Sequence, residues 1–321
     1  AVKMIMIGHN MDINNKKSQL KVALWTLFGT SICISLTTNL AKVANINGLQ
    51  PMPFMLWSLC LSAIALILNM LIKQEKMPKA MNALRYYFWS AVWSVTLPNL
   101  ILFFGVPKVG VSFVALTMCL PPLLTYLGAL MMGLERVSAW RIGGVAFALT
   151  GAFILVAAQW NLNVSNQLWL VITLLGPVFL AMGNIYRTLH WPAGSKPEAL
   201  APGMILFGSI MLLAFGAIHA DTSIQFELSK THIGLILLQG LVFTAQYLLL
   251  FILQKAGGPV FLSLIGTISA AISVPVATIL LGEPLLKALA PSALLMLIGL
   301  LMMIKGQNAQ RSNTALSQSE A

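Results

Sequence analysis

The sequence predicts an all-α membrane protein of ten transmembrane helices, arranged as two inverted five-helix repeats around a central cavity. Three features of the 321-residue chain predict this fold. Ten stretches of about twenty mostly apolar residues follow one another, positive charge alternates between the connections, and the second half repeats spacings of the first. Each stretch is long enough to cross a hydrocarbon core about 30 Å thick as a helix.

The expected spans are Leu20–Ala41, Pro51–Ile72, Tyr86–Phe104, Val109–Gly133, Trp140–Ala158, Gln167–Leu189, Ala199–Ile218, Ile233–Leu253, Pro259–Leu281 and Leu285–Ile304. Every second connection, counted from the N-terminal tail, is rich in Lys and Arg. These segments hold 15 of the basic residues, and the others hold four. Because cytoplasmic loops carry the excess of Lys and Arg, we expect a multi-pass protein of the bacterial inner membrane with both termini in the cytoplasm.

Composition agrees with this prediction. Apolar residues make up 58% of the chain and charged residues 8%, whereas a soluble surface needs about a quarter charged. The net charge of +11 therefore comes mostly from the basic residues of the cytoplasmic connections, which face anionic lipid head groups. We expect membrane lipids but no nucleic acid as partners. Cys33, Cys60 and Cys119 fall inside spans without metal-ligand spacing, so we expect packing residues, no metal and no cofactor.

An internal repeat relates residues 110–155 to residues 258–303 at a constant offset of 148. The matched pairs are Gly110 with Gly258, Phe113 with Phe261, Leu116 with Leu264, Ala129 with Ala277, Glu135 with Glu283 and Gly151 with Gly299. Five spans separate the copies, and five is odd, so the second copy enters the membrane from the opposite side. We expect a tail (1–19), a first repeat (20–158), a second, inverted repeat (159–305) and a second tail (306–321).

Residues 110–156 read GVSFVALTMCLPPLLTYLGALMMGLERVSAWRIGGVAFALTGAFILV. This stretch resembles the fourth-to-fifth-helix signature of EamA-type members of the drug/metabolite transporter superfamily. Pro122 stands thirteen residues before Glu135, which closes the helix, and a Gly-rich helix follows. The second copy ends in LLGEPLL around Glu283, but Ala270 stands where Pro122 is expected and a proline occurs at Pro275 instead.

The resemblance implies a central cavity formed by helices one to four and six to nine, with helices five and ten at the periphery. The sequence supports the peripheral place of helix five, since Gly144, Ala148 and Ala152 form a small-residue face for close helix contact. That face can serve packing within the chain or a homodimer, so both a monomer and a homodimer stay open.

No ionisable residue lies in the middle third of any expected span. Proton-driven antiporters commonly need a titratable group at depth, so a multidrug cation antiporter is disfavoured. The leading hypothesis is a secondary transporter, by family analogy an exporter, of a small neutral or zwitterionic metabolite such as an amino acid or related compound.

Polar side chains at depth are the candidate substrate-binding residues, because hydrocarbon penalises a polar group that lacks a partner. They are Ser31, Ser35, Trp93, Asn99, Thr117, Tyr126, Asn184, Gln239, Gln246, Tyr247 and Thr267. Ser31 and Ser35 belong to a stripe that continues through Thr38 to Lys42. The alternative for Ser and Thr is a hydrogen bond to the carbonyl four residues earlier in their own helix.

A second set forms candidate gate or capping residues: Pro122, Glu135, Pro177, Arg187 and Glu283. Pro121–Pro122 and Gly176–Pro177 are expected to break their helices. Arg187 either extends to lipid phosphates or meets a substrate carboxylate.

Two other functions compete with transport of a small metabolite. A translocator of lipid or lipid-linked sugar needs a basic head-group pocket, for which Arg187 with Lys196 is the candidate. An intramembrane enzyme needs a nucleophile with a base, paired acids or metal ligands. The four histidines lie in tails or loops, and G-x-S-x-G and H-E-x-x-H are absent, so we expect no catalytic residues.

Overall fold

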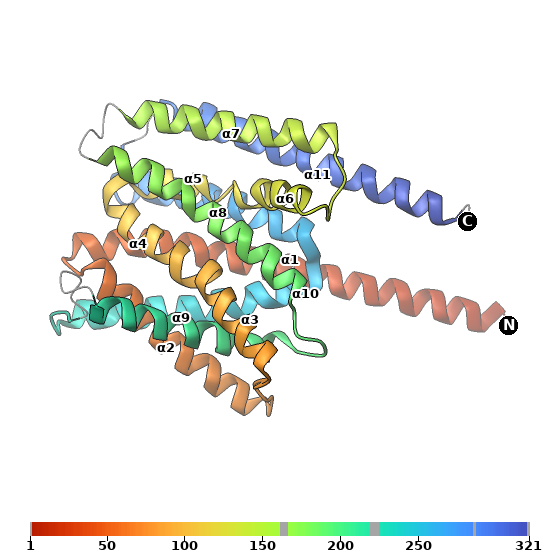
Figure 1. Cartoon of the computed structure of the whole chain (residues 1–321), viewed down its shortest axis with the longest axis horizontal. Coiled ribbons are helices and arrows are strands. Elements are labelled where there is room, and N and C mark those ends of the chain that lie inside the picture. The colour runs from red at the N-terminus through yellow and green to blue at the C-terminus, as the bar shows by residue number, and fades with distance from the viewer. Residues whose placement is uncertain (1, 161–165, 219–224, 285–286, 320–321) are drawn as a thin grey trace.

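The computed structural model describes residues 2–160, 166–218, 225–284 and 287–319. Its elements are α1 (Val2–Ile46), α2 (Pro51–Ile72), α3 (Met81–Ala91), the π-helical segment η1 (Val92–Thr96), α4 (Leu97–Val109), α5 (Val111–Thr117), α6 (Pro121–Met131), α7 (Ala139–Trp160), α8 (Gln167–Leu189), α9 (Pro197–Ile218), α10 (Lys230–Ile279) and α11 (Leu289–Ser319). Figure 1 shows these helices as one bundle.

Within these ranges, nine helices are long and apolar enough to cross a membrane, and Leu264–Ile279 forms a shorter apolar helix. Many of their large apolar side chains point outward, among them Trp25, Ile72 and Met131, which are 79%, 81% and 90% exposed. Exposed apolar surface on this scale requires lipid rather than water around the bundle. The chain is therefore a multi-pass membrane protein.

Helix α10 folds back on itself. Thr37 Oγ1 donates to Gln246 Oε1 (3.0 Å), and the Oγ1 of the next residue, Thr38, lies 2.8 Å from Ser273 Oγ. A straight helix of 1.5 Å rise per residue would separate Gln246 from Ser273 by about 40 Å. Both arms of α10, Lys230–Ala256 (the first arm) and Leu264–Ile279 (the second arm), therefore pack along α1.

Both ends of the chain leave the bundle at the same end (Figure 1). Helix α1 begins at Val2 and helix α11 continues to Ser319, so both tails extend their helices beyond the bundle. The spans Pro51–Ile72 and Gln167–Leu189 have the predicted bounds, whereas the third span is longer at both ends than predicted, running from Met81 to Val109.

Proline residues interrupt two of the spans. In the third span, Leu97 N–H bonds to Val92 O, five residues back, just before Pro98. Pro98 cannot donate, and its ring excludes a regular turn, so the chain widens into η1. The predicted kink before Pro122 is confirmed, because α5 ends at Thr117 and α6 begins at Pro121.

The predicted break at Gly176–Pro177 is wrong. Helix α8 runs without interruption through both residues, which are buried. Gly176 packs beside α4, where an added Cβ would lie 3.5 Å from Ile101 Cγ2. A proline removes one hydrogen bond from a membrane helix, and neighbouring helices can hold the segment in helical form despite that loss.

Helices α7 and α11 lie side by side at one edge of the bundle (Figure 1). A Cβ on Gly144 would overlap the carbonyl oxygen of Gly299, and a Cβ on Gly151 would lie 2.8 Å from that of Ser292. A Cβ on Gly299 would lie 3.0 Å from Ala148 Cβ. The small-residue face of helix five is thus occupied by α11 and serves packing within the chain.

Candidate functional site

The polar stripe of α1 faces the second arm of α10. Ser31 Oγ donates to its own helix at Leu27 O (2.8 Å), which is the alternative expected for this hydroxyl, and it also lies 3.3 Å from Ile265 O of α10. Two turns on, Ser273 Oγ bonds to Thr38 and accepts from Asn39 Nδ2 (2.9 Å). Ser35 is buried and supplies the carbonyl to which Asn39 also donates.

The first arm of α10 meets another side of α1 through two glutamines. Gln239 Nε2 donates to Thr37 Oγ1 (3.0 Å), and Thr37 in turn donates to Gln246 Oε1 (3.0 Å). All three side chains are buried, and Gln239 Oε1 has no hydrogen-bond partner. The two predicted glutamines therefore both bond to the Thr37 hydroxyl, and the amide oxygen of Gln239 stays available to a ligand or a water molecule.

A contact between two of the candidate binding residues, Asn99 and Tyr247, links the two halves of the chain. Asn99 Nδ2 donates to Tyr247 Oη (2.8 Å) and to Val95 O (2.7 Å), the latter within the segment distorted by Pro98. Both side chains are buried. Tyr247 lies on the same arm as Gln246, so residues from α1, α4 and α10 approach one another.

Arg187 is buried rather than extended toward lipid. Its side chain is among the largest that are fully enclosed, with 2% of the residue exposed. Nη2 donates to Asn184 Oδ1 (2.8 Å), and Nε donates to Gln254 Oε1 (3.2 Å). The expectation that the guanidinium extends to lipid phosphates is thus wrong, because the side chain turns inward between α8 and α10.

Glu283 joins α1, α5 and the end of α10. Its Oε1 accepts from Lys42 Nζ (2.7 Å) and Val111 N (2.7 Å), and its Oε2 accepts from Ser112 N (2.8 Å) and Ser112 Oγ (2.6 Å). The carboxylate caps the N-terminus of α5, where free N–H groups and the helix dipole favour negative charge. We call Glu283, Lys42, Val111 and Ser112 the Glu283 latch.

The latch should be insensitive to pH from neutral to mildly acidic conditions. Burial alone would raise the pKa of Glu283, but hydrogen bonds from Lys42, Ser112 and Val111 outweigh it and lower the pKa below its ordinary value. A lowered folded-state pKa gives stability that is complete above the ordinary value and is lost only as pH falls through the folded-state value. The unfolding-temperature difference between wild type and Glu283→Gln should therefore stay constant from pH 8 to about 5.5 and shrink in stronger acid. A difference that already shrinks near pH 7 would contradict this.

Glu135, which matches Glu283 in the sequence at the offset of 148, lies in a different arrangement. Arg141 Nη1 donates to Glu135 Oε2 (2.8 Å), and the Arg141 guanidinium stacks 3.7 Å above the Tyr126 ring. Tyr126 Oη accepts from Ser138 N (3.1 Å) and lies 3.3 Å from Arg136 O. Tyr126 thus holds the turn between α6 and α7 and is not brought to Thr37, Gln239 and Gln246.

The remaining predicted residues are placed apart from the glutamines. Thr117 Oγ1 bonds back to Val114 O (2.7 Å) in its own helix. Trp93 is half-buried and stacks between Trp89 and Phe179, with ring centroids 5.8 Å away on each side. Because Trp89 is 42% exposed, this aromatic stack reaches the outer surface of the bundle.

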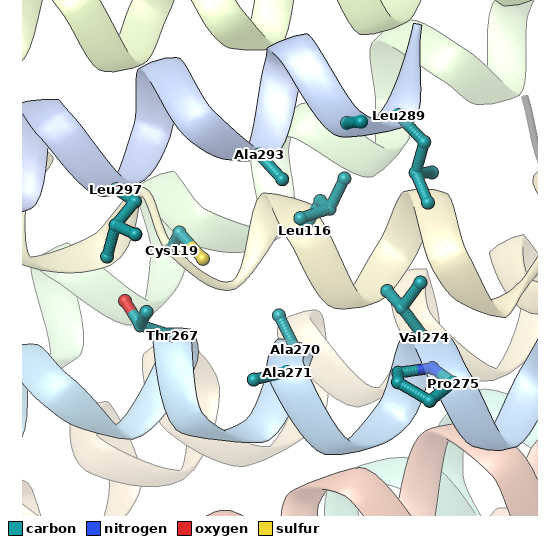
Figure 2. Close-up of a pocket in the computed structure, with 11 residues that line it drawn as sticks. Leu116, Cys119, Thr267, Ala270, Ala271, Val274, Pro275, Leu289, Ala293 and Leu297 are labelled. Carbon is teal, nitrogen blue, oxygen red and sulfur yellow. The ribbon is translucent and has the colours of Figure 1, made fainter. Parts of the chain in front are cut away.

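Thr267 lines a cavity of about 330 Å³ between α5, the second arm of α10 and α11 (Figure 2). Its lining residues are Leu116, Cys119, Thr267, Ala270, Ala271, Val274, Pro275, Leu289, Ala290, Ala293 and Leu297. Nearly all of them are apolar. This cavity therefore suits an apolar group, and among the predicted binding residues it contains Thr267 alone.

Sequence reasoning missed several residues that complete these contacts: Thr37, Asn39, Ser112, Gln254 and Ser273. Asn39 and Gln254 carried a usable signal, since each is an amide close to a predicted polar residue in an apolar helix. Across the described ranges, no three His, Cys, Asp or Glu side chains group so as to hold a metal ion.

Comparison with known proteins agrees with this geometry. The model of the EamA-like transporter family matches residues 21–157. A solved crystal structure superposes with a TM-score of 0.64 at 12% identity, over 89% of this chain and 98% of that chain, which shows a shared fold. No curated protein matches the sequence. Over residues 21–157 the chain is thus similar to the EamA-like transporter family, which is part of the drug/metabolite transporter superfamily.

Proposed function

We propose that the protein is a secondary transporter that exports a small zwitterionic or neutral metabolite, such as an amino acid or related compound, by alternating access across the bacterial inner membrane. The family match supports a transporter of the drug/metabolite type. The single observation that carries the alternating-access part is that residues 148 positions apart touch each other between the two halves.

Two such self-pairs support a pseudo-two-fold axis. Asn99 bonds to Tyr247, and Tyr247 occupies the position in the second half that corresponds to Asn99 at the offset of 148. The backbone of Met118 packs closely against Gly266, and Gly266 corresponds to Met118 at the same offset. In a two-fold arrangement, only positions on the axis can contact their own images. The axis would thus pass close to the Asn99–Tyr247 bond and to the break between α5 and α6.

Reciprocal contacts between α7 and α11 give further support. Gly144 packs against Gly299, which is the equivalent of Gly151, and Gly151 packs against Ser292, which is the equivalent of Gly144. Such exchange of partners is the property of an isologous contact. Inverted repeats of this kind form transporters that rock one half against the other around a site at their interface.

The position of the chain ends supports ten crossings. Both termini leave at one end of the bundle, which requires an even number of passes. Nine long spans with the shorter helix Leu264–Ile279 make an even number. With the positive-inside charge bias, the shared end is cytoplasmic, and the Glu283 latch, at the far end of α1, closes the outer mouth.

The competing functions lose their support. Lys196, the other half of the candidate head-group pocket, is exposed and bonds to Glu75, so it does not join the buried Arg187. His232 binds the backbone carbonyls of Glu227 and Asn47, a structural role. We therefore propose neither a lipid translocator nor an enzyme.

Solute flux in proteoliposomes tests the proposal. Counterflow of radiolabelled amino acids and related metabolites should be saturable for at least one solute. Gln246→Ala should slow it about tenfold, because loss of the amide leaves the buried Thr37 hydroxyl without the oxygen to which it donates. Gln50→Ala is the matched control, since Gln50 is exposed and its side chain makes no capping bond. A panel in which no solute exchanges would contradict the proposal.

A further inference from the structure

Arg187 carries a positive charge in an enclosed position near the cytoplasmic end of the bundle. It lies in the last turn of α8, opposite the end of the first arm of α10. The guanidinium lies 5.9 Å from the Phe251 ring centroid, and its hydrogen bonds go to the amides of Asn184 and Gln254. Two amides and an aromatic ring thus lie around the charge.

The hydrogen-bond partners of Arg187 are neutral. Asn184 and Gln254 each supply one amide oxygen, and Nη1 has no hydrogen-bond partner in the structure. The ion pairs found among the described side chains join other residues and leave Arg187 without a carboxylate. A buried charge without a counter-ion costs several kcal/mol in a protein interior.

Arg141 gives the contrast within the same chain. Its side chain is just as enclosed, with 4% exposed, yet it pairs with Glu135 at 2.8 Å. The fold therefore supplies a carboxylate to one buried arginine and none to the other. Ionisable residues enclosed among membrane helices often mark substrate or ion pathways, so a buried cation without a carboxylate indicates a functional site.

A second open polar group lies one turn away. Ser94 Oγ has no hydrogen-bond partner and packs against Gly183, where an added Cβ would overlap it. Gly183 precedes Arg187 by one turn on the same helix, and Ser94 belongs to η1. A π-helical segment often marks a functional site. The free Nη1 and the free hydroxyl thus lie along the same junction of η1 with α8.

We propose that Arg187 binds the carboxylate of the transported solute, so that the substrates are carboxylates, amino acids among them, and neutral solutes are excluded. This rests on the proposed transport function and narrows it. Nη1 offers its free N–H groups, and the neutral amides of Asn184 and Gln254 hold the guanidinium in place until the carboxylate arrives. A carboxylate bound to a guanidinium makes charge-assisted bonds of about twice the strength of neutral ones.

Thermal unfolding of the full chain in phosphatidylcholine nanodiscs, with L-amino acids and their carboxamides as matched probes, tests this. At saturating concentration, at least one acid should raise the unfolding temperature by several degrees, since a ligand that binds only the folded state stabilises it. Its carboxamide should not. A panel in which acids and amides act alike, or in which no acid acts, would overturn the proposal.

Variants separate binding from a structural role. Arg187→Gln should leave the unfolding temperature of the ligand-free protein unchanged or raise it, because it removes an unpaired charge, and should abolish the shift by the acid. Arg187→Lys should weaken binding of the acid at least tenfold, since lysine keeps the positive charge but lacks the planar set of N–H donors that matches a carboxylate. Arg85→Gln, at an exposed cation beside Tyr186, is the matched control and should respond like wild type.

Two results contradict the proposal and leave transport intact. One is an Arg187→Gln protein that keeps the acid-dependent shift. The other is stabilisation by phosphatidylglycerol in the nanodisc but by no solute, which would assign the guanidinium to a lipid phosphate. Counterflow of a neutral solute in proteoliposomes would likewise overturn the carboxylate assignment while supporting the transport function.

Discussion

Gly266→Ala is expected to prevent the protein from accumulating in folded form. An added Cβ at this position would overlap the carbonyl group of Met118, in the break between α5 and α6. Neighbouring backbone cannot give way as a flexible side chain can, so the two helices must separate. We expect a cost of about 4 kcal/mol or more, at the upper end of single-mutation effects. Size-exclusion yield and unfolding temperature in detergent measure it.

Gly234→Ala is the matched control in the same helix. Its added Cβ would meet nothing within 4 Å, so it should be neutral or stabilise the helix by up to about 1 kcal/mol. If Gly266→Ala yielded as much protein as Gly234→Ala, with the same unfolding temperature, the close approach of α10 to Met118 would be wrong.

Glu283→Gln is expected to open the outer mouth that we propose the latch to close. The carboxylate accepts four hydrogen bonds, one of them from Lys42, and its side chain is 8% exposed. All four partners of Glu283 donate hydrogen bonds, so the NH₂ group of the glutamine amide cannot replace a carboxylate oxygen. The neutral amide also leaves Lys42 without a counter-charge. We expect the substitution to destabilise the closed state by about 2 kcal/mol relative to the open state, which lowers the closed-to-open ratio roughly thirtyfold. A thiol placed at Ser273, buried behind the latch, should then react about thirtyfold faster with a membrane-impermeant maleimide.

The control for this variant is Glu135→Gln. Glu135 matches Glu283 in the sequence at the offset of 148, but it pairs with Arg141 within its own half. It should not change the labelling of the thiol at position 273. Equal acceleration by both variants would mean general loosening of the bundle instead of a latch. The native cysteines Cys33, Cys60 and Cys119 are replaced beforehand in both proteins.

Local sequence was sufficient for the elements that local chemistry determines. Span α2 begins at Pro51, a residue suited to the first turn, and ends where Lys73 follows the apolar run. The break before Pro122 likewise follows from consecutive prolines. At Pro177, a similar local signal failed because packing against α4 keeps α8 helical.

Contacts between the halves could not be predicted from spacing. The pairing of Lys42 with Glu283 joins residues 241 positions apart, and Thr37 meets Gln239 and Gln246 from a position beside the predicted stripe. The burial of Arg187 is also a tertiary effect. Its position near a helix end fits extension to the surface equally well, and only the packing of α10 over α8 decides between them.

Reversible closure of the outer mouth tests the central claim, alternating access, most directly. Lys42→Cys with Glu283→Cys, in the chain without native cysteines, places two thiols across the latch, where the native side chains meet at 2.7 Å. A short reducible bifunctional thiol reagent should stop counterflow of the transported solute in proteoliposomes, and reduction should restore it. Full counterflow with the cross-link complete would contradict alternating access through this mouth.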